Sequence, residues 1–225
     1  MSKYSECYRP IDLRIQREIE AAKKSGPFTI GVNGIDASGK TTFALHLSEH
    51  LTGRGYDVQI VHVDDFHNEK SVRYSGEDPA YNFYYKSINL ARLAADILEP
   101  IIRKGELDVE LTLLDLRSDK FILRKQYRVH RDSIVIVEGI FLFKRELRNY
   151  FDYKVFLDIS FDEAIRRALI RDTHLPFDEI EQRYKSKYQA GQRIYFALEN
   201  PIRCADLVID NNNPHAPVAT VQEKG

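Results

Sequence analysis

A short glycine-containing segment carries the residues best suited to chemistry. Residues 34–41 read G-I-D-A-S-G-K-T and match the G-x-x-x-x-G-K-[ST] spacing of a phosphate-binding loop. The glycines let the backbone wrap an anion with its N–H groups pointing inward, and a following helix adds the positive end of its dipole. Lys40 can reach the β- and γ-phosphates of a nucleoside triphosphate, and the Thr41 hydroxyl can ligate Mg²⁺. The predicted nucleotide-binding residues are Gly34, Asp36, Ala37, Ser38, Gly39, Lys40, Thr41 and Thr42.

A glycine turn between a strand and a helix is the alternative for this segment. Such a spacing also arises by chance in ordinary sequences, so its surroundings matter. An apolar run precedes the segment and an amphipathic pattern follows it, in the order that a phosphate loop requires. The context therefore favours the phosphate loop.

Acidic residues follow two of the apolar runs. Asp64 and Asp65 come after residues 57–63, and Glu138 follows residues 134–137. Ligands of open α/β sheets bind beyond the carboxyl ends of the strands, and phosphoryl transfer needs a carboxylate near the acceptor and Mg²⁺ near the donor. We predict that Asp64 orients and deprotonates an acceptor hydroxyl and lies close to the metal, and that Glu138 holds the water shell of Mg²⁺. Whether Asp64 or Asp65 is the base stays open, and helix caps or solvated turns are the alternative for all three acids.

Two highly charged helical segments, residues 161–172 and 179–198, supply cations. Arg167 and Arg171 are four residues apart and share a helix face, from which they could stabilise a transferring phosphoryl group beneath a closing lid. The alternative is a solvated face, because acidic residues are interleaved with the arginines. We predict catalytic roles for both arginines and for Lys40, and leave open which lid cations contact phosphate.

A group of aromatic residues after the acidic pair could form part of an acceptor pocket. Tyr84 could stack on a base, and Asp78 could accept a hydrogen bond from a sugar hydroxyl. Together with Asp65, these are the predicted substrate-binding residues. Packing against the protein surface explains the same aromatic composition.

An alternation of strands and helices must position these residues. Apolar runs predict buried strands at residues 28–33, 57–63, 134–137, 155–159 and 207–209, and amphipathic patterns predict helices at residues 11–24, 41–51 and 89–103. Residues 110–114 and 121–129 could form a β-hairpin. The alternation indicates an α/β fold, with a parallel sheet covered on both faces. Residues 161–198 would be a mobile lid and residues 211–225 a polar tail, and without a long linker we expect a single domain over residues 1–225.

The composition limits the class of protein. With 33 Lys+Arg against 34 Asp+Glu, the chain lacks the basic excess of a nucleic-acid or anionic-membrane binder, so any anion must meet locally placed cations. Two scattered cysteines, a start unlike a signal peptide and the lack of a membrane-length apolar run predict a soluble, cytoplasmic protein. A homo-oligomer is possible, but the sequence does not distinguish apolar residues of a subunit interface from apolar residues of the core.

In their order and spacing, these segments resemble the uridine kinase and phosphoribulokinase family of P-loop kinases. The resemblance rests on the phosphate loop, Asp64-Asp65-Phe66-His67, Glu138-Gly139, the arginine helix and residues 205–209, and extends over residues 28–210. It implies a P-loop NTPase three-layer sandwich with a five-stranded parallel sheet in the order 2-3-1-4-5, ATP or GTP as phosphoryl donor, and Mg²⁺ as cofactor. By this resemblance Asp64 matches the catalytic aspartate, Glu138 the metal-shell glutamate, and Arg167 and Arg171 the lid arginines.

The resemblance defines the acceptor less well than the donor. Uridine–cytidine kinases carry a Tyr-Asp-Phe segment and a nearby histidine that grip the base, whereas this chain has Leu114-Asp115-Leu116 and no histidine until His130. Asp65 stands where these kinases have a serine, and this second acid resembles nicotinamide riboside kinases. We expect a kinase that phosphorylates a small-molecule hydroxyl, with uridine as the first candidate and nicotinamide riboside, pantothenate or a sugar phosphate as alternatives.

Other classes of nucleotide-binding protein are the remaining hypotheses. A GTPase switch would need an Asn-Lys-x-Asp motif and a transport ATPase a Leu-Ser-Gly-Gly-Gln signature, and the sequence contains neither. A non-catalytic nucleotide-binding regulator stays an alternative, although the intact Lys40, Thr41 and Asp64 argue against it.

Overall fold

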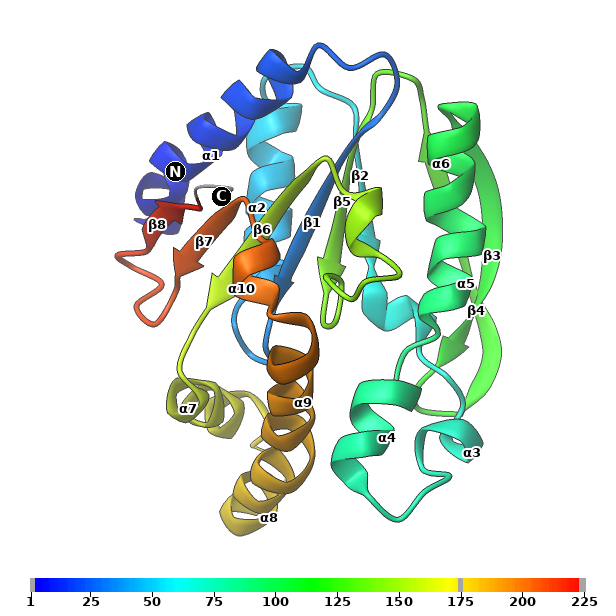
Figure 1. The fold of residues 1–225 in the computed structure, drawn as a ribbon, viewed down its shortest axis with the longest axis vertical. Helices are drawn as coiled ribbons and strands as arrows, with labels where there is room; N and C mark the ends of the chain where they lie inside the picture. Colours follow the sequence, from blue (N-terminus) through cyan, green and yellow to red (C-terminus); the bar gives the residue numbers. More distant parts are fainter. Residues whose placement is uncertain (1–2, 174–175, 223–225) are drawn as a thin grey trace.

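The computed structural model describes residues 3–173 and 176–222, and at its centre five strands form a parallel sheet (Figure 1). β1 (Phe28–Gly34) lies between β5 (Ile134–Gly139) and β6 (Tyr153–Asp158), β2 (Val58–His62) borders β5, and β7 (Leu207–Asp210) borders β6. Counted along the parallel strands alone, the order is the predicted 2-3-1-4-5. The expected α/β fold class is confirmed.

A sixth strand departs from the prediction. β8 (Val218–Val221) pairs antiparallel with β7 and lies in the segment that we expected to be only a polar tail. All four residues of β8 are exposed, so the strand has no buried face from which hydrophobic alternation could arise. Backbone pairing along the open edge of β7 holds it instead.

Helices cover both faces of the sheet, which explains why β1 and β5 are buried along their whole length. On one face, α1 (Lys3–Ala22) and α2 (Lys40–Thr52) pack Ile15, Phe43 and Leu47 onto β-strand residues such as Ile30. The other face is covered by α5 (Leu90–Leu93), the π-helical segment Ala94–Leu98, α6 (Glu99–Lys104), α9 (Ala190–Glu199) and α10 (Pro201–Cys204).

The predicted β-hairpin is present as a separate two-stranded sheet. β3 (Leu107–Asp115) and β4 (Lys120–Val129) pair antiparallel and lie beside α5 and α6 (Figure 1). The hairpin buries one face, which includes Leu113 and Tyr127, and exposes the other. It therefore adds a wall beside the sheet without extending it.

Several short elements gather beyond the carboxyl ends of the strands, toward which the arrowheads point in Figure 1. They are the 3-10 turn Val63–Phe66, α3 (Lys70–Arg73), α4 (Pro79–Lys86), α7 (Phe161–Arg171), α8 (Phe177–Arg183) and the π-helical segment Tyr184–Gln189, which runs into α9. The 3-10 turn Arg148–Tyr150 lies at the opposite end of the sheet, where the Tyr150 carbonyl accepts a hydrogen bond from the Thr29 hydroxyl at the start of β1. The charged helices of the predicted lid are confirmed as helices, although the second is three consecutive pieces. We did not anticipate α4, which begins at Asp78 and Pro79, an N-cap residue followed by proline.

None of the helices in the described ranges combines the length and apolar character needed to cross a membrane.

One buried hydroxyl joins the lid to the sheet. Tyr195 on α9 is 1% exposed, and its hydroxyl accepts hydrogen bonds from the side-chain amide of Asn33 (2.6 Å) and the backbone N–H of Phe143 (2.8 Å). Asn33 lies at the end of β1 and Phe143 in the loop after β5. A single phenol therefore fixes α9 against two strand ends.

We predict that Tyr195→Phe lowers the free energy of unfolding by about 2 kcal/mol, because each buried donor left unsatisfied costs roughly 1–3 kcal/mol. Denaturant unfolding measures the change. Tyr56→Phe is the control, since that hydroxyl lies at the surface, 3.4 Å from Glu20, and its loss should cost less than about 0.5 kcal/mol. Equal losses in the two variants would contradict the assigned role.

Candidate functional site

The predicted phosphate loop turns sharply between β1 and α2. Its backbone takes left-handed conformations at Ala37 (φ 60°) and at Gly39 (φ 94°), the residue that caps α2. A side chain at Gly39 would meet the amide nitrogen of Asn211 at 2.9 Å. Glycine is therefore required here both for its backbone angles and for the close approach of its neighbour.

Asn211 supports the loop from behind, which the sequence analysis missed. Its buried amide donates to the Ser38 carbonyl (2.7 Å), and its side-chain oxygen accepts a hydrogen bond from the Tyr8 hydroxyl on α1. The only sequence signal was a run of asparagines directly after the last predicted strand. Lys40, on the open side of the loop, donates to the Ile35 carbonyl (2.8 Å).

Glu138 is held by two donors from distant parts of the chain. The carboxylate is 5% exposed, and its Oε1 accepts hydrogen bonds from the Thr41 hydroxyl (3.0 Å) and from Nδ1–H of His62, 2.6 Å away. Parallel pairing of β2 and β5 places His62 opposite Glu138. Nothing in the local sequence singles out His62, and only strand register reveals this contact.

The donor atoms around Glu138 fit Mg²⁺. The ion prefers oxygen ligands and in nucleotide sites uses one or two protein groups together with phosphate oxygens and water. The Thr41 hydroxyl and the Glu138 carboxylate lie side by side and supply such oxygens. Within residues 3–173 and 176–222, no three His, Cys, Asp or Glu side chains gather as an all-protein metal site.

The two neighbouring aspartates have different surroundings. The Asp65 carboxylate accepts hydrogen bonds from Lys125 Nζ (2.6 Å) and from the Tyr127 hydroxyl (2.8 Å), both on β4. Asp64 instead lines the cavity that also contains Lys40. The geometry therefore favours Asp64 as the base and gives Asp65 a tethering role between η1 (Val63–Phe66) and the hairpin.

The two predicted lid arginines also differ. Arg167 donates to the Asn211 carbonyl (2.5 Å), the Asn212 carbonyl (3.3 Å) and the Ala37 carbonyl (3.3 Å), and pairs with Glu163 (2.7 Å). It clamps α7 onto the phosphate loop and the segment after β7. Every one of its nitrogens is engaged in these contacts, so its first role is to hold the loop.

Arg171 lies one helical turn further along α7. It forms a bidentate pair with Asp172 (2.7 and 2.9 Å) and donates to the Tyr184 hydroxyl (3.1 Å). Its guanidinium lines the same cavity as Lys40 and Asp64. Arg171 is therefore the lid cation whose surroundings agree best with the predicted phosphate contact.

Asp36 places a third carboxylate beside Lys40. Burial raises the pKa of Asp36, the positive charge of Lys40 opposes the rise, and the negative charge of Asp64 adds to it. The side-chain amide of Gln192 on α9 donates to Asp36 across 3.5 Å. The phosphate loop is thus in contact with the lid at Asp36 as well as at Arg167.

These side chains converge on one cavity of about 440 Å³. Its lining comprises Asp36, Ala37, Gly39, Lys40, Thr41, Thr42, Asp64, Glu138, Gly139, Ile140, Arg167 and Arg171. The predicted nucleotide, metal and catalytic residues therefore meet, with Gly34 and Ser38 forming the loop behind them.

The predicted substrate-binding residues do not line this cavity. Asp78 caps α4 by accepting from the backbone N–H groups of Ala80 and Tyr81 (2.8 and 3.1 Å). Tyr84 is 4% exposed, and the Lys144 ammonium lies 3.8 Å from its ring centroid. Both have structural roles, and acceptor contacts from Asp65, Asp78 or Tyr84 stay predictions.

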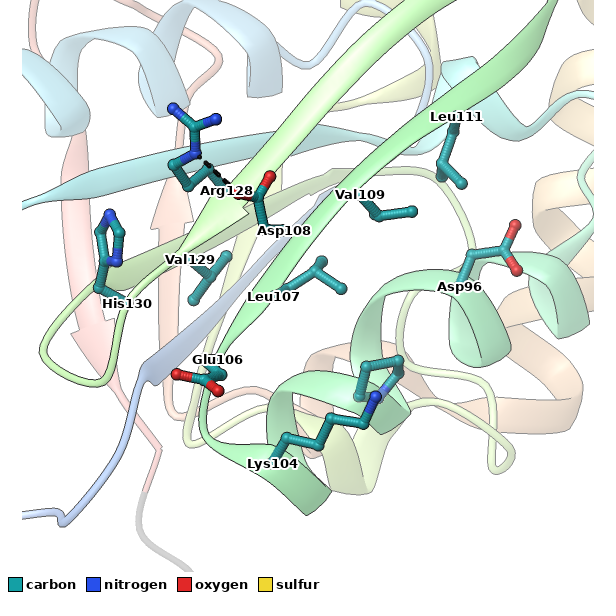
Figure 2. Close-up of a pocket in the computed structure, with 11 residues that line it drawn as sticks. Asp96, Lys104, Glu106, Leu107, Asp108, Val109, Leu111, Arg128, Val129 and His130 are labelled. Carbon is teal, nitrogen blue, oxygen red and sulfur yellow. Dashed lines mark hydrogen bonds and ion pairs between the residues drawn. The ribbon is translucent and has the colours of Figure 1, made fainter.

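A larger cavity, of about 610 Å³, lies away from this chemistry (Figure 2). It opens between the hairpin and α6, where Asp108 and Arg128 form an ion pair (3.3 Å) on one wall and Lys104 lies on the other. Acidic, basic and apolar side chains line it, and no phosphate-loop residue is among them. Choosing the candidate site by cavity volume alone would therefore miss the cavity that contains the phosphate loop.

Comparison with known proteins agrees with the geometry. The family model of the phosphoribulokinase / uridine kinase family matches residues 29–186. A uridine kinase of Geobacillus kaustophilus is 29% identical over 189 residues, 81% of this chain and 85% of the relative, and that of Deinococcus deserti is 28% identical over 207 residues, 85% and 91% of the two chains. The solved structure of a possible uridine kinase from Bacillus stearothermophilus is similar with a TM-score of 0.65 at 25% identity, covering 88% of this chain and all of the other.

Close contact between two strand ends yields a prediction. A Cβ added at Gly139 would lie 2.3 Å from the Cβ of buried Val63, so Gly139→Ala must push apart the segments that carry Glu138 and Asp64. We expect a loss of about 1–3 kcal/mol in unfolding free energy, as for overpacked cores, together with weaker nucleotide binding. Denaturant unfolding and calorimetric titration with ATP measure the two effects.

Gly53→Ala is the matched control. Gly53 has φ −62°, and its nearest added-Cβ contact is 3.3 Å from the Glu49 carbonyl, so the substitution should leave ATP affinity unchanged. Unaltered ATP affinity in Gly139→Ala would show that the contact with Val63 does not position the site.

Proposed function

The chain belongs to the phosphoribulokinase / uridine kinase family, and from that premise we propose that it is an ATP-dependent kinase that phosphorylates a hydroxyl of a small metabolite, with a nucleoside such as uridine as the first candidate. Family membership makes it a kinase, a phosphotransferase. One observation supports the finer proposal most strongly: Lys40, Thr41, Asp64 and Glu138 line a single cavity at the carboxyl ends of the strands. Such a set supplies donor binding, metal binding and a base in one place.

The donor side of the reaction depends on the phosphate loop. Its backbone N–H groups and Lys40 would hold the β- and γ-phosphates, with Arg171 reaching the γ-phosphate from the lid. Mg²⁺, when bound, would be held by the Thr41 hydroxyl, by Glu138 through water and near Asp64, and supplies positive charge to the phosphate oxygens. His62 keeps the Glu138 carboxylate in one orientation by hydrogen bonding to Oε1, which leaves Oε2 for the water shell.

The acceptor side depends on Asp64. Its carboxylate would accept a hydrogen bond from the acceptor hydroxyl and take the proton as the hydroxyl oxygen bonds to the γ-phosphorus. The bond between that phosphorus and the β,γ-bridging oxygen breaks, and ADP leaves with the electron pair. Arg167 clamps the loop during this exchange, and the lid excludes water from the cavity.

The hairpin gives one reason to test acceptors other than uridine. Asp115 occupies the position where uridine–cytidine kinases carry a base-gripping aspartate, yet its carboxylate accepts hydrogen bonds from the Ser118 hydroxyl (2.6 Å) and the Arg117 and Ser118 backbone N–H groups (3.2 Å each). These turn contacts lower the pKa of Asp115, with the Ser118 hydroxyl as the largest cause. Nicotinamide riboside, pantothenate and sugar phosphates are therefore the second group of candidates.

An acceptor screen with γ-labelled ATP tests the proposal directly. The panel contains uridine, cytidine, nicotinamide riboside, pantothenate and phosphorylated sugars, and we expect label transfer to one class well above ATP hydrolysis. Background turnover with the whole panel would favour the remaining alternative, a non-catalytic nucleotide-binding regulator.

We predict that Asp64→Asn retains ATP binding but lowers kcat by about 10²–10⁴-fold, the usual contribution of a general base. Asp65→Asn is the matched control: its amide oxygen can still accept from Tyr127, so kcat should fall only a few-fold. Steady-state kinetics with the best acceptor and calorimetric ATP titration separate the two effects. A larger loss of kcat in Asp65→Asn than in Asp64→Asn would identify Asp65, and not Asp64, as the base.

Lys40→Ala should weaken ATP binding at least tenfold, because the variant loses the phosphate-loop cation. Lys104→Ala, in the remote cavity of Figure 2, provides a control with the same change of net charge. Calorimetric titration with ATP in the presence of Mg²⁺ measures both affinities. Unchanged affinity in Lys40→Ala would refute the phosphate-loop assignment.

A further inference from the structure

A second cavity, of about 410 Å³, separates the lid from the segment that joins α3 to α4. Tyr74 and Pro79 form one wall, and α8 with the π-helical segment after it forms the other. Arg183, Ser186 and Lys187 are among the residues of the lid wall. Glu179 and Gln182 complete this wall, so two cations and one carboxylate line the space.

Lys187 carries a charge without a matching partner. Its ammonium lies among three aromatic rings, with centroids at 4.9 Å (Tyr74), 5.1 Å (Tyr188) and 6.0 Å (Phe83). An ammonium has three donors, and the contact with the Tyr74 hydroxyl at 3.5 Å occupies one of them. Among the residues that the structure describes, no carboxylate forms an ion pair with Lys187, whereas partly buried cations are normally paired.

Two more cations lie against the rings of Tyr188 and Tyr74. Arg183 stacks on the Tyr188 ring at 5.6 Å, and Arg73 lies 5.5 Å from the Tyr74 ring. The Arg73 side chain is 13% exposed and pairs with Asp119 at 3.5 Å, but its Nε is buried without a hydrogen-bond partner.

The pKa values of this cluster report a positive local potential. Burial lowers the pKa of Lys187, and Arg183 and Arg73 lower it further, although Tyr74 opposes them. The pKa of the Tyr74 hydroxyl also lies below its usual value: burial raises it, but Lys187, Arg73 and Arg183 together outweigh burial. Glu179 is the acidic residue on the cavity wall, and it is exposed and without an ion pair in the described ranges. A bound anion would relieve the repulsion between these cations.

We propose that Lys187 and Arg183, with the Tyr74 hydroxyl, bind a phosphate group in this cavity, and that Arg73 strengthens the site through its charge. The ligand class is a small phosphate-bearing molecule or inorganic phosphate, which share this chemistry. The site is distinct from the phosphate loop, since none of its lining residues belongs to the 440 Å³ cavity.

The site lies close to the reaction cavity. Arg171, which lines the reaction cavity, donates to the Tyr184 hydroxyl (3.1 Å), and the Tyr184 ring lies 5.0 Å from that of Tyr188, against which Arg183 lies. The existence of the site does not depend on the proposed function, but the source of its phosphate does. An acceptor whose hydroxyl lies at Asp64 could place its own phosphate here, or free phosphate could occupy the site.

Inorganic phosphate is the probe for the site itself, measured by calorimetric titration of the full chain. Because the phosphate loop would also bind phosphate, Lys40→Ala is used to weaken that contribution at least tenfold, and we expect one tighter phosphate site to remain in this variant. Adding Lys187→Gln or Arg183→Gln should weaken the remaining affinity at least tenfold. Lys185→Gln is the matched control, because Lys185 lies two residues away, is 60% exposed and pairs with Glu181 at 2.7 Å.

A spectroscopic readout distinguishes binding from a general loss of structure. The chain has 13 tyrosines and no tryptophan, so tyrosinate absorbance can be followed during a pH titration. Phosphate should raise the pKa of one tyrosine, and Tyr74→Phe should abolish that change. Arg183 is exposed, so Arg183→Gln serves where Lys187→Gln fails to fold.

Loss of all phosphate binding in Lys40→Ala alone would overturn the inference, as would unchanged binding in both added variants. A kinetic arm identifies the source. A tenfold higher KM for a phosphorylated acceptor in Lys187→Gln, with little change in kcat, would assign the phosphate to the acceptor. Alternatively, free phosphate could change the rate of uridine phosphorylation. If Lys187→Gln abolishes that change, the site binds free phosphate. If no acceptor is phosphorylated, the proposed function fails while the binding result still stands.

Discussion

The hydrogen bonds that converge on the Glu138 carboxylate are the interaction on which the rest of the site depends. A buried carboxylate needs donors, because an unpaired one would cost several kcal/mol. Its two donors come from residues 97 and 76 positions away in the chain, Thr41 at the start of α2 and His62 at the end of β2. Satisfying one oxygen therefore fixes the phosphate loop, β2 and β5 relative to each other. Asp64 follows His62 by two residues and is carried to the same place.

Although the 33 basic and 34 acidic residues nearly balance, individual cations near the phosphate loop have different roles. Arg167 and Arg171 lie on one face of α7, as their spacing predicted, yet their surroundings differ. Arg167 is bound to three carbonyl oxygens and stabilises the loop, whereas Arg171 pairs with a neighbouring aspartate and lines the cavity. One helix therefore carries both an arginine that holds the phosphate loop and an arginine that lines the cavity.

The part of the fold and of the site that the sequence predicts is the part that depends on local patterns. The phosphate loop, the strands and the hairpin follow from glycine spacing and hydrophobic periodicity, which are local signals, whereas the order of the strands was implied only by the family resemblance. Contacts set by strand register or by the chain end leave no such signal, as with His62 beside Glu138 and Asn211 behind the loop. β8 was missed for a related reason, since its four residues are all exposed. Asp78 and Tyr84 show the converse, because residue types suited to a substrate can equally cap a helix or fill a core.

The donor side and the acceptor side of the proposed reaction differ in how well the sequence predicts them. The donor side depends on a loop whose backbone angles and strand register leave little freedom. For the acceptor side, the side chains that were predicted from residue type, Asp65, Asp78 and Tyr84, do not line the cavity that contains Lys40 and Asp64. Asp65 connects the hairpin to the cavity, because it is adjacent to Asp64 and its carboxylate is bound to Lys125 and Tyr127 of the hairpin. A displacement of the hairpin would therefore act through Asp65 on the backbone next to Asp64, the residue proposed as the base.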